Sequence, residues 1–117
     1  MNDFAKLPGM HLTEIGRGVF LLEPSRSLDI SAQDELVVAV LARLQQAEAS
    51  KLYYDLAALP LIEPLYYQWL NRLARACGAI NAGMVCINFQ PTAAFALAHH
   101  METPPAFSAA LSIRERA

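Results

Sequence analysis

The stretch from residue 51 to residue 77 constrains the fold of this chain more than any other. KLYYDL at 51–56 is short and rich in aromatic residues, which is typical of an interior β-strand. A loop follows, and then Glu63 and Pro64 open a helix, because proline suits the first helical turn. A buried strand that leads through a short loop into an amphipathic helix predicts an α/β fold.

The rest of the chain continues this alternation. The other expected elements are a hairpin of strands 11–15 and 19–22, a helix capped by Ser31, a strand over 83–89, a helix from Gln90 and Pro91, a short strand over 106–109 and a helical turn from Ser112 to Ala117. This order predicts an α/β fold with a mixed, largely parallel sheet of four to five strands. Right-handed crossovers pack the sheet against three to four helices.

Helical spacing predicts which side chains each helix buries. In the first helix these are Val37, Val40, Leu41 and Leu44; in the second, Tyr66, Trp69, Leu70, Leu73 and Cys77; in the third, Ala94, Leu97, Ala98 and Met101. Gly78 is expected to end the second helix. The side chains expected to face water from that helix are Gln68, Asn71, Arg72 and Arg75.

Length and composition limit what such a fold is used for. The chain has 117 residues, which predicts a single domain, 1–117, in which residues 1–9 form a flexible N-terminal segment. Apolar residues make up 55% and charged residues only 17%. This apolar surplus indicates a surface that a partner covers.

Charge and hydropathy exclude several classes of function. The net charge is −2 and there is no basic run, so we expect no nucleic-acid partner. No apolar stretch is long enough to span a bilayer and no signal pattern is present, which predicts a cytoplasmic protein without membrane insertion. Cys77 and Cys86 are expected to be reduced core thiols, with a disulfide or redox pair as the alternative.

The sequence gives no support to catalysis, so we expect a protein that is not an enzyme and that has no cofactor. A glycine-rich phosphate loop, a G-x-S-x-G motif and an H-E-x-x-H motif are all missing from the sequence. His99 and His100 are adjacent, so on a helix they point about 100° apart, and no third ligand has metal-site spacing. We therefore predict no metal site.

The element order and several local signatures resemble the STAS domain, named for sulfate transporters and anti-sigma factor antagonists. The similarity is strongest at Asp55-Leu56 and Ile62-Glu63, which match a pattern of the form D-L-S-G-V-x-x-I-D-S-S-G-L. The similarity covers nearly the whole chain. Further matching positions are Leu28 and Asp29 before the first helix, Gly78, Pro91, and the run Ala110, Leu111 and Ser112.

The resemblance implies a role in bacterial signal transduction and transcription regulation. Single-domain STAS proteins commonly bind a serine kinase that is also an anti-sigma factor, and others build the stressosome scaffold. In both groups a serine or threonine at the start of the second helix is phosphorylated, which breaks or changes the contact. A phosphate adds nearly two negative charges where the partner must dock.

When this pattern is aligned with the chain, the serine or threonine that would be phosphorylated is missing. The acid before the serine falls on Glu63, the two hydroxyl positions fall on Pro64 and Leu65, and the glycine falls on Tyr66. Neither phosphoacceptor is present, so the resemblance implies docking without phosphorylation at this position.

We therefore expect a protein-interaction module whose contact surface is the outer face of the second helix. Its predicted partner-binding residues are Glu63, Pro64, Leu65, Tyr67 and Asn71. The expected partner is a serine kinase that is an anti-sigma factor, another STAS protein, or a second copy of this chain. The alternatives are that Glu63 merely caps the helix and that Tyr67 is half-buried. Thr92 is expected to be either a cap of the third helix or a second phosphorylation site.

Two further functions are left open by the resemblance. STAS domains also sit on transport complexes, so the chain is alternatively a cytoplasmic regulatory subunit of a membrane transporter. A third option is a sensor domain for a small apolar or nucleotide ligand, which ligand-dependent shifts in melting temperature would reveal.

Incubation with a kinase of this family and ATP should add no phosphate to serine or threonine within residues 60–68, because that segment contains neither. Phosphopeptide mass spectrometry checks this. Label at Thr92 would mean that the switch has moved along the chain rather than vanished.

Overall fold

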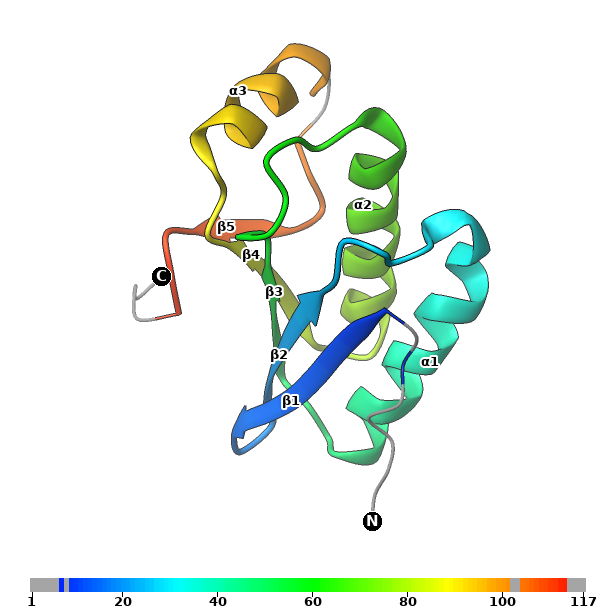
Figure 1. Ribbon diagram of the computed structural model, residues 1–117. Helices are drawn as coiled ribbons and strands as arrows, with labels where there is room; N and C mark the ends of the chain where they lie inside the picture. Colours follow the sequence, from blue (N-terminus) through cyan, green and yellow to red (C-terminus); the bar gives the residue numbers. More distant parts are fainter. Residues whose placement is uncertain (1–6, 8, 102–103, 114–117) are drawn as a thin grey trace.

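The computed structural model describes residues 7, 9–101 and 104–113, which form one sheet and its helices (Figure 1). The elements in chain order are β1 (Met10–Gly16), β2 (Val19–Pro24), the 3-10 helix η2 (Ile30–Ala32), α1 (Gln33–Gln46), β3 (Lys51–Asp55), α2 (Pro64–Ala79), β4 (Gly83–Ile87), α3 (Pro91–His100) and β5 (Ser108–Ala110). The predicted α/β fold with a mixed sheet is confirmed.

The strands lie side by side in the order in which they occur along the chain, β1-β2-β3-β4-β5. β1 and β2 form the antiparallel hairpin, and every later pair is parallel. β3 is therefore the central strand, as its sequence predicts. Because successive parallel crossovers share one hand, α1 and α2 cover the same face of the sheet (Figure 1).

The core lies between that face of the sheet and the two helices. Alternate side chains of the strands point into it, because successive residues of a strand point to opposite faces. The strands contribute Phe20, Leu22, Leu52, Tyr54, Met84 and Cys86; α1 contributes Leu36, Val40 and Leu44; α2 contributes Trp69, Leu70, Leu73 and Cys77. The predicted face of α2 is thus correct, and on α1 Val37 and Leu41 are half-buried at its margin.

The start of α1 differs from the prediction. Ser31 does not cap the helix; instead Oδ1 of Asp29 accepts hydrogen bonds from the Ser31 backbone N (2.9 Å) and from its hydroxyl (2.7 Å). These bonds begin the 3-10 turn η2, and α1 follows from Gln33. Asp29 therefore caps η2, whereas the N-cap residue of α1 is Ala32, which makes no side-chain capping hydrogen bond.

The end of α2 also differs. Gly78 lies inside the helix, which continues to Ala79. Asn81 takes the left-handed conformation (φ 62°), and the Ala82 N–H donates to the carbonyl of Cys77 (2.9 Å). Asparagine tolerates this conformation well enough to replace glycine at a helix end, so the terminating residue lies later in the chain than predicted.

α3 buries a face shifted by one residue from the predicted one. Ala93 and Leu97 are buried, whereas Ala94 and Ala98 are exposed and Met101 is half-buried. An alanine-rich helix gives little contrast between its faces, which explains the error. β5 begins two residues later than predicted, at Ser108.

The chain ends lie partly outside the described residues. The predicted helical turn from Ser112 to Ala117 falls there from residue 114 onward. The flexible segment expected over 1–9 likewise falls largely outside them, although Leu7 is described and packs against the core.

Asn71 was predicted to face water and is in fact buried. Its Nδ2 donates to the carbonyl of Tyr67 (3.1 Å), and its Oδ1 accepts from the backbone N–H of Ala106 (2.6 Å). The ring of Tyr67 packs edge-on against Phe107, with centroids 6.2 Å apart. This side of α2 is therefore tied to the segment that leads into β5.

Replacing Asn71 with alanine removes both hydrogen bonds. We expect the free energy of unfolding to fall by about 1–2 kcal/mol, because each bond contributes roughly 0.5–1.5 kcal/mol. Gln68→Ala, at an exposed position on the same helix, should change it by less than about 0.5 kcal/mol. Urea denaturation measures the free energy of unfolding of both variants. An equal decrease in the two would mean that the hydrogen bonds of Asn71 do not stabilise the fold.

Candidate functional site

The candidate site is the connection from the central strand β3 into α2, at the carboxyl end of the sheet (Figure 1). Leu56 and Ile62 anchor this loop at either end, and both are fully buried. Between them Leu61 is 53% exposed, and Leu65 in the first turn of α2 is also 53% exposed. Two large apolar side chains thus reach the surface within five residues.

The first half of the loop is held by the carboxylate that ends β3. Oδ1 of Asp55 accepts hydrogen bonds from the backbone N–H of Ala57 (2.9 Å) and from Nδ2 of Asn88 (3.1 Å). Asn88 directly follows β4 and takes a left-handed conformation (φ 61°), which asparagine tolerates. The ends of two neighbouring strands are therefore joined beneath the loop.

The start of α3 holds the loop at two further points. Nε2 of Gln90 donates to the carbonyl of Ala57 (2.5 Å), and the hydroxyl of Thr92 donates to the carbonyl of Pro60 (2.6 Å). The side chain of Thr92 is thus used across the loop, so the prediction that it caps α3 is wrong; the N-cap residue is Gln90. The loop backbone is fixed from both sides.

The five predicted contact residues separate into two groups. Glu63, Pro64 and Leu65 are exposed at the start of α2, and the side chain of Glu63 makes no capping hydrogen bond. Tyr67 is half-buried and Asn71 is buried, both turned toward the segment before β5. Sequence analysis missed Leu61, because nothing in the loop sequence separates it from its fully buried neighbour Ile62.

A buried polar cluster lies directly beneath the start of α2. Nε1 of Trp69 donates to the hydroxyl of Tyr54 (2.9 Å), and that hydroxyl lies 2.6 Å from the hydroxyl of Tyr66. The two tyrosine rings meet edge to face, with centroids 6.4 Å apart. Tyr66, which occupies the position of a small glycine in the STAS pattern, therefore fixes the first turn of α2 to the central strand.

Burial sets the protonation state of this region. Burial raises the pKa of Tyr66 to about 12 and the pKa of Tyr54 well above its usual value. Burial likewise raises the pKa of Cys77 to about 11, and it raises the pKa of Cys86 above its ordinary range. Both buried cysteines are therefore neutral thiols at pH 7, which are poor nucleophiles and poor metal ligands.

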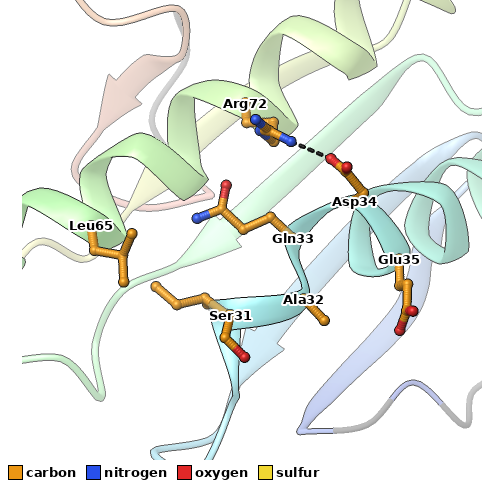
Figure 2. Close-up of a pocket in the computed structure, with 8 residues that line it drawn as sticks. Ser31, Ala32, Gln33, Asp34, Glu35, Leu65 and Arg72 are labelled. Carbon is orange, nitrogen blue, oxygen red and sulfur yellow. Dashed lines mark hydrogen bonds and ion pairs between the residues drawn. The ribbon is translucent and has the colours of Figure 1, made fainter.

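A shallow groove of about 350 Å³ separates the start of α2 from η2 and the start of α1. Figure 2 shows Leu65 and Gln33 projecting into the space between the helices, while Arg72 is paired with Asp34 and Glu35 points away. The Arg72 and Asp34 side chains are 50% and 87% exposed, so this ion pair contributes at most about 1 kcal/mol. Ser31 supplies the only hydroxyl among the residues that line the groove, and this hydroxyl donates to the carboxylate of Asp29.

The groups that would make a metal site are also not assembled within the described part of the chain. There, no three His, Cys, Asp or Glu side chains are close enough to hold an ion. His99 instead packs on the ring of Phe95 (centroids 4.7 Å apart), and its Nδ1 lies 3.0 Å from the Phe95 carbonyl oxygen. None of the described helices is both long enough and apolar enough to cross a membrane.

No protein-family model and no curated protein sequence matches the chain. Solved structures do match it. A variant of RsbS from Moorella thermoacetica, with one serine replaced by glutamate, superposes with a TM-score of 0.73 over 88% of this chain and 89% of its own, at 13% identity. The NMR structure of the protein TM1081 gives a TM-score of 0.68 over 86% and 79%, at 12% identity.

The chain has the STAS fold. At identities of 12–13% the agreement concerns architecture, and it extends over most of the length of both neighbours. The resemblance found in the sequence is confirmed at this level.

The tyrosine cluster predicts a loss of stability at alkaline pH. Unfolded tyrosines lose their protons near pH 10, whereas folded Tyr66, with its pKa raised to about 12, keeps its proton further into the alkaline range. The stabilisation is therefore complete below about pH 10 and is lost as the pH rises from about 10 toward 12. Urea denaturation followed through Trp69 fluorescence checks this.

The double variant Tyr54→Phe with Tyr66→Phe is the control. It should be less stable at pH 7, because the Trp69 N–H loses its acceptor. Between about pH 10 and 12, its free energy of unfolding should also decline less steeply than that of the unmodified chain. An unchanged decline would mean that other groups cause the alkaline unfolding.

Proposed function

We propose that this protein is a non-enzymatic protein-interaction module of the STAS fold, comparable to an anti-sigma factor antagonist or a stressosome scaffold subunit. It docks through the start of α2 without a phosphorylation switch at that position. The single observation that carries the proposal is the pair of exposed leucines, Leu61 and Leu65, on an immobilised connection. One of them stands where the pattern has a hydroxyl.

The rigidity of the connection supports docking. Apolar side chains contribute most to binding when they are ordered beforehand, because ordering a loop on binding costs free energy. Here the loop carbonyls of Ala57 and Pro60 are both held by α3 and the residue that caps it, and the first turn of α2 is held by Tyr66. Leu61 and Leu65 are therefore presented in fixed positions, as anchor residues of protein interfaces commonly are.

The chemistry of the helix start supports constant rather than switched binding. Pro64 and Leu65 offer no hydroxyl, and proline also fixes the backbone of the first turn. The STAS resemblance suggests a serine kinase that is an anti-sigma factor, or another STAS protein, as the partner class. We place the protein in the bacterial cytoplasm, in signal transduction that controls transcription.

The absence of a catalytic arrangement in the groove beside α2 agrees with a binding role. The only hydroxyl that lines it is that of Ser31, which donates to Asp29 and has no histidine or lysine beside it among the lining residues. Cys77 and Cys86 are buried and neutral, so neither supplies a nucleophile.

Leu65→Asp should weaken partner binding at least tenfold, because it places a charge in an apolar contact. The partner is first isolated by co-purification from the native host and identified by mass spectrometry. Its affinity is then measured by calorimetry with purified proteins. Leu61→Asp is expected to have an effect of the same direction.

Val38→Asp is the matched control, since Val38 is 66% exposed but lies on α1, outside both the connection between β3 and α2 and the lining of the groove. It should leave affinity unchanged. Tyr67→Ala is less informative, because Tyr67 packs on Phe107 and its loss also disturbs the fold. Unchanged affinity in both leucine variants would remove this surface from consideration.

A further inference from the structure

We propose that a second copy of this chain binds the uncharged end of the molecule formed by the loop 57–63 and the first turns of α2 and α3. The inference rests on the proposed function, because it names one partner for the same surface. It also extends that surface onto α3, which the sequence pattern does not indicate. We call the exposed apolar side chains of this end, Leu61, Leu65 and Phe95, the end patch.

Phe95 joins the two leucines because of how α3 is attached. The side chain of Phe95 is 71% exposed, so most of a large apolar ring faces solvent. Thr92, one helical turn earlier, donates its hydroxyl to Pro60, the residue before Leu61. Residues three apart lie on the same side of a helix, so Phe95 follows Thr92 on the side that meets the loop. Figure 1 shows α3, the loop and the start of α2 together at this end.

Apart from the groove that Leu65 borders, where Asp34, Glu35 and Arg72 lie, the segments around the end patch carry almost no charge. In residues 56–71 and 88–98, Glu63 is the only Asp, Glu, Lys or Arg. Most of these residues are exposed or half-buried, among them Ala57, Ala58, Ala94 and Ala98. A soluble surface normally mixes charges of both signs, so their absence here indicates that this end is covered in the working protein.

The lack of charge favours a second copy as the occupant. In a two-fold symmetric contact each patch meets itself, so every charged group near the axis faces its own kind and is repelled. An apolar, uncharged patch avoids that cost and is complementary to itself. The one carboxylate, Glu63, makes no capping hydrogen bond that would hold it in the contact, and it is accommodated at the solvated rim.

The size and rigidity of the end suit a stable contact. A standard interface takes roughly 800 Å² and 20–30 residues from each partner. The chain exposes 6854 Å² in all, so such a contact covers a small part of its surface. Two mostly accessible segments, 56–71 and 88–98, supply enough residues. The hydrogen bonds from Gln90 and Thr92 already hold the loop, so binding a second copy costs little conformational entropy in this loop.

Sedimentation equilibrium of the purified full chain, from about 5 to 500 µM, tests the inference. We expect a monomer–dimer equilibrium with a dissociation constant below about 100 µM. Phe95→Asp and Leu61→Asp should each raise that constant at least tenfold, because each places like charges across the symmetry axis. Val38→Asp, exposed to a similar degree on α1, should leave it unchanged. Raising the salt concentration tenfold should also have little effect, since the contact contains no ion pairs.

A wild-type chain that stays monomeric at the highest concentration would overturn the inference. So would a dimer that Val38→Asp breaks as readily as Phe95→Asp, or one that dissociates in high salt. Circular dichroism shows whether each variant folds, and Phe95→Ser replaces any that does not. If the chain is monomeric but Leu65→Asp still abolishes binding to another protein, the dimer is wrong and the proposed function stands. If Phe95→Asp breaks a dimer while Leu65→Asp leaves other partners bound, the dimer stands and the proposed docking of other partners at this surface is wrong.

Discussion

The arrangement of the site depends on the contact between α2 and the central strand, which the Trp69–Tyr54–Tyr66 cluster fixes. Tyr54 is fully buried, so its hydroxyl needs partners, and it finds them only if the first turn of α2 lies directly over β3. That position in turn forces the chain to leave β3, cross the edge of the sheet and re-enter the core at Ile62 within a few residues. The exposed leucines follow from this short, constrained path.

The sequence was sufficient to predict the parts of the fold in which local pattern and tertiary role agree. The interior strand, the opening of α2 at Pro64 and the buried face of that helix are all strongly patterned, and each is present. Asn71 was misassigned because helical spacing places it among polar residues, whereas its amide is held by Ala106, far along the chain. Spacing within one helix carries no information about such a distant partner.

The exposure of the residues at the candidate site was predictable only in part. The start of α2 was identified from the STAS pattern, and Leu65 is exposed there as that prediction requires. Leu61 and Phe95 were missed for different reasons. Loops have no hydrophobic period against which an outward leucine stands out, and in α3 the choice of buried face between Ala93 and Ala94 depends on how Thr92 meets the loop.

The hydrogen bond between Asn71 and Ala106 gives α2 a second attachment to the rest of the fold. The helix is attached at its first turn to the central strand through Tyr66, and a turn later to the segment entering β5 through Asn71. A displacement of the start of α2 at Leu65 therefore strains contacts with both the central strand and the segment that enters β5 at the edge of the sheet.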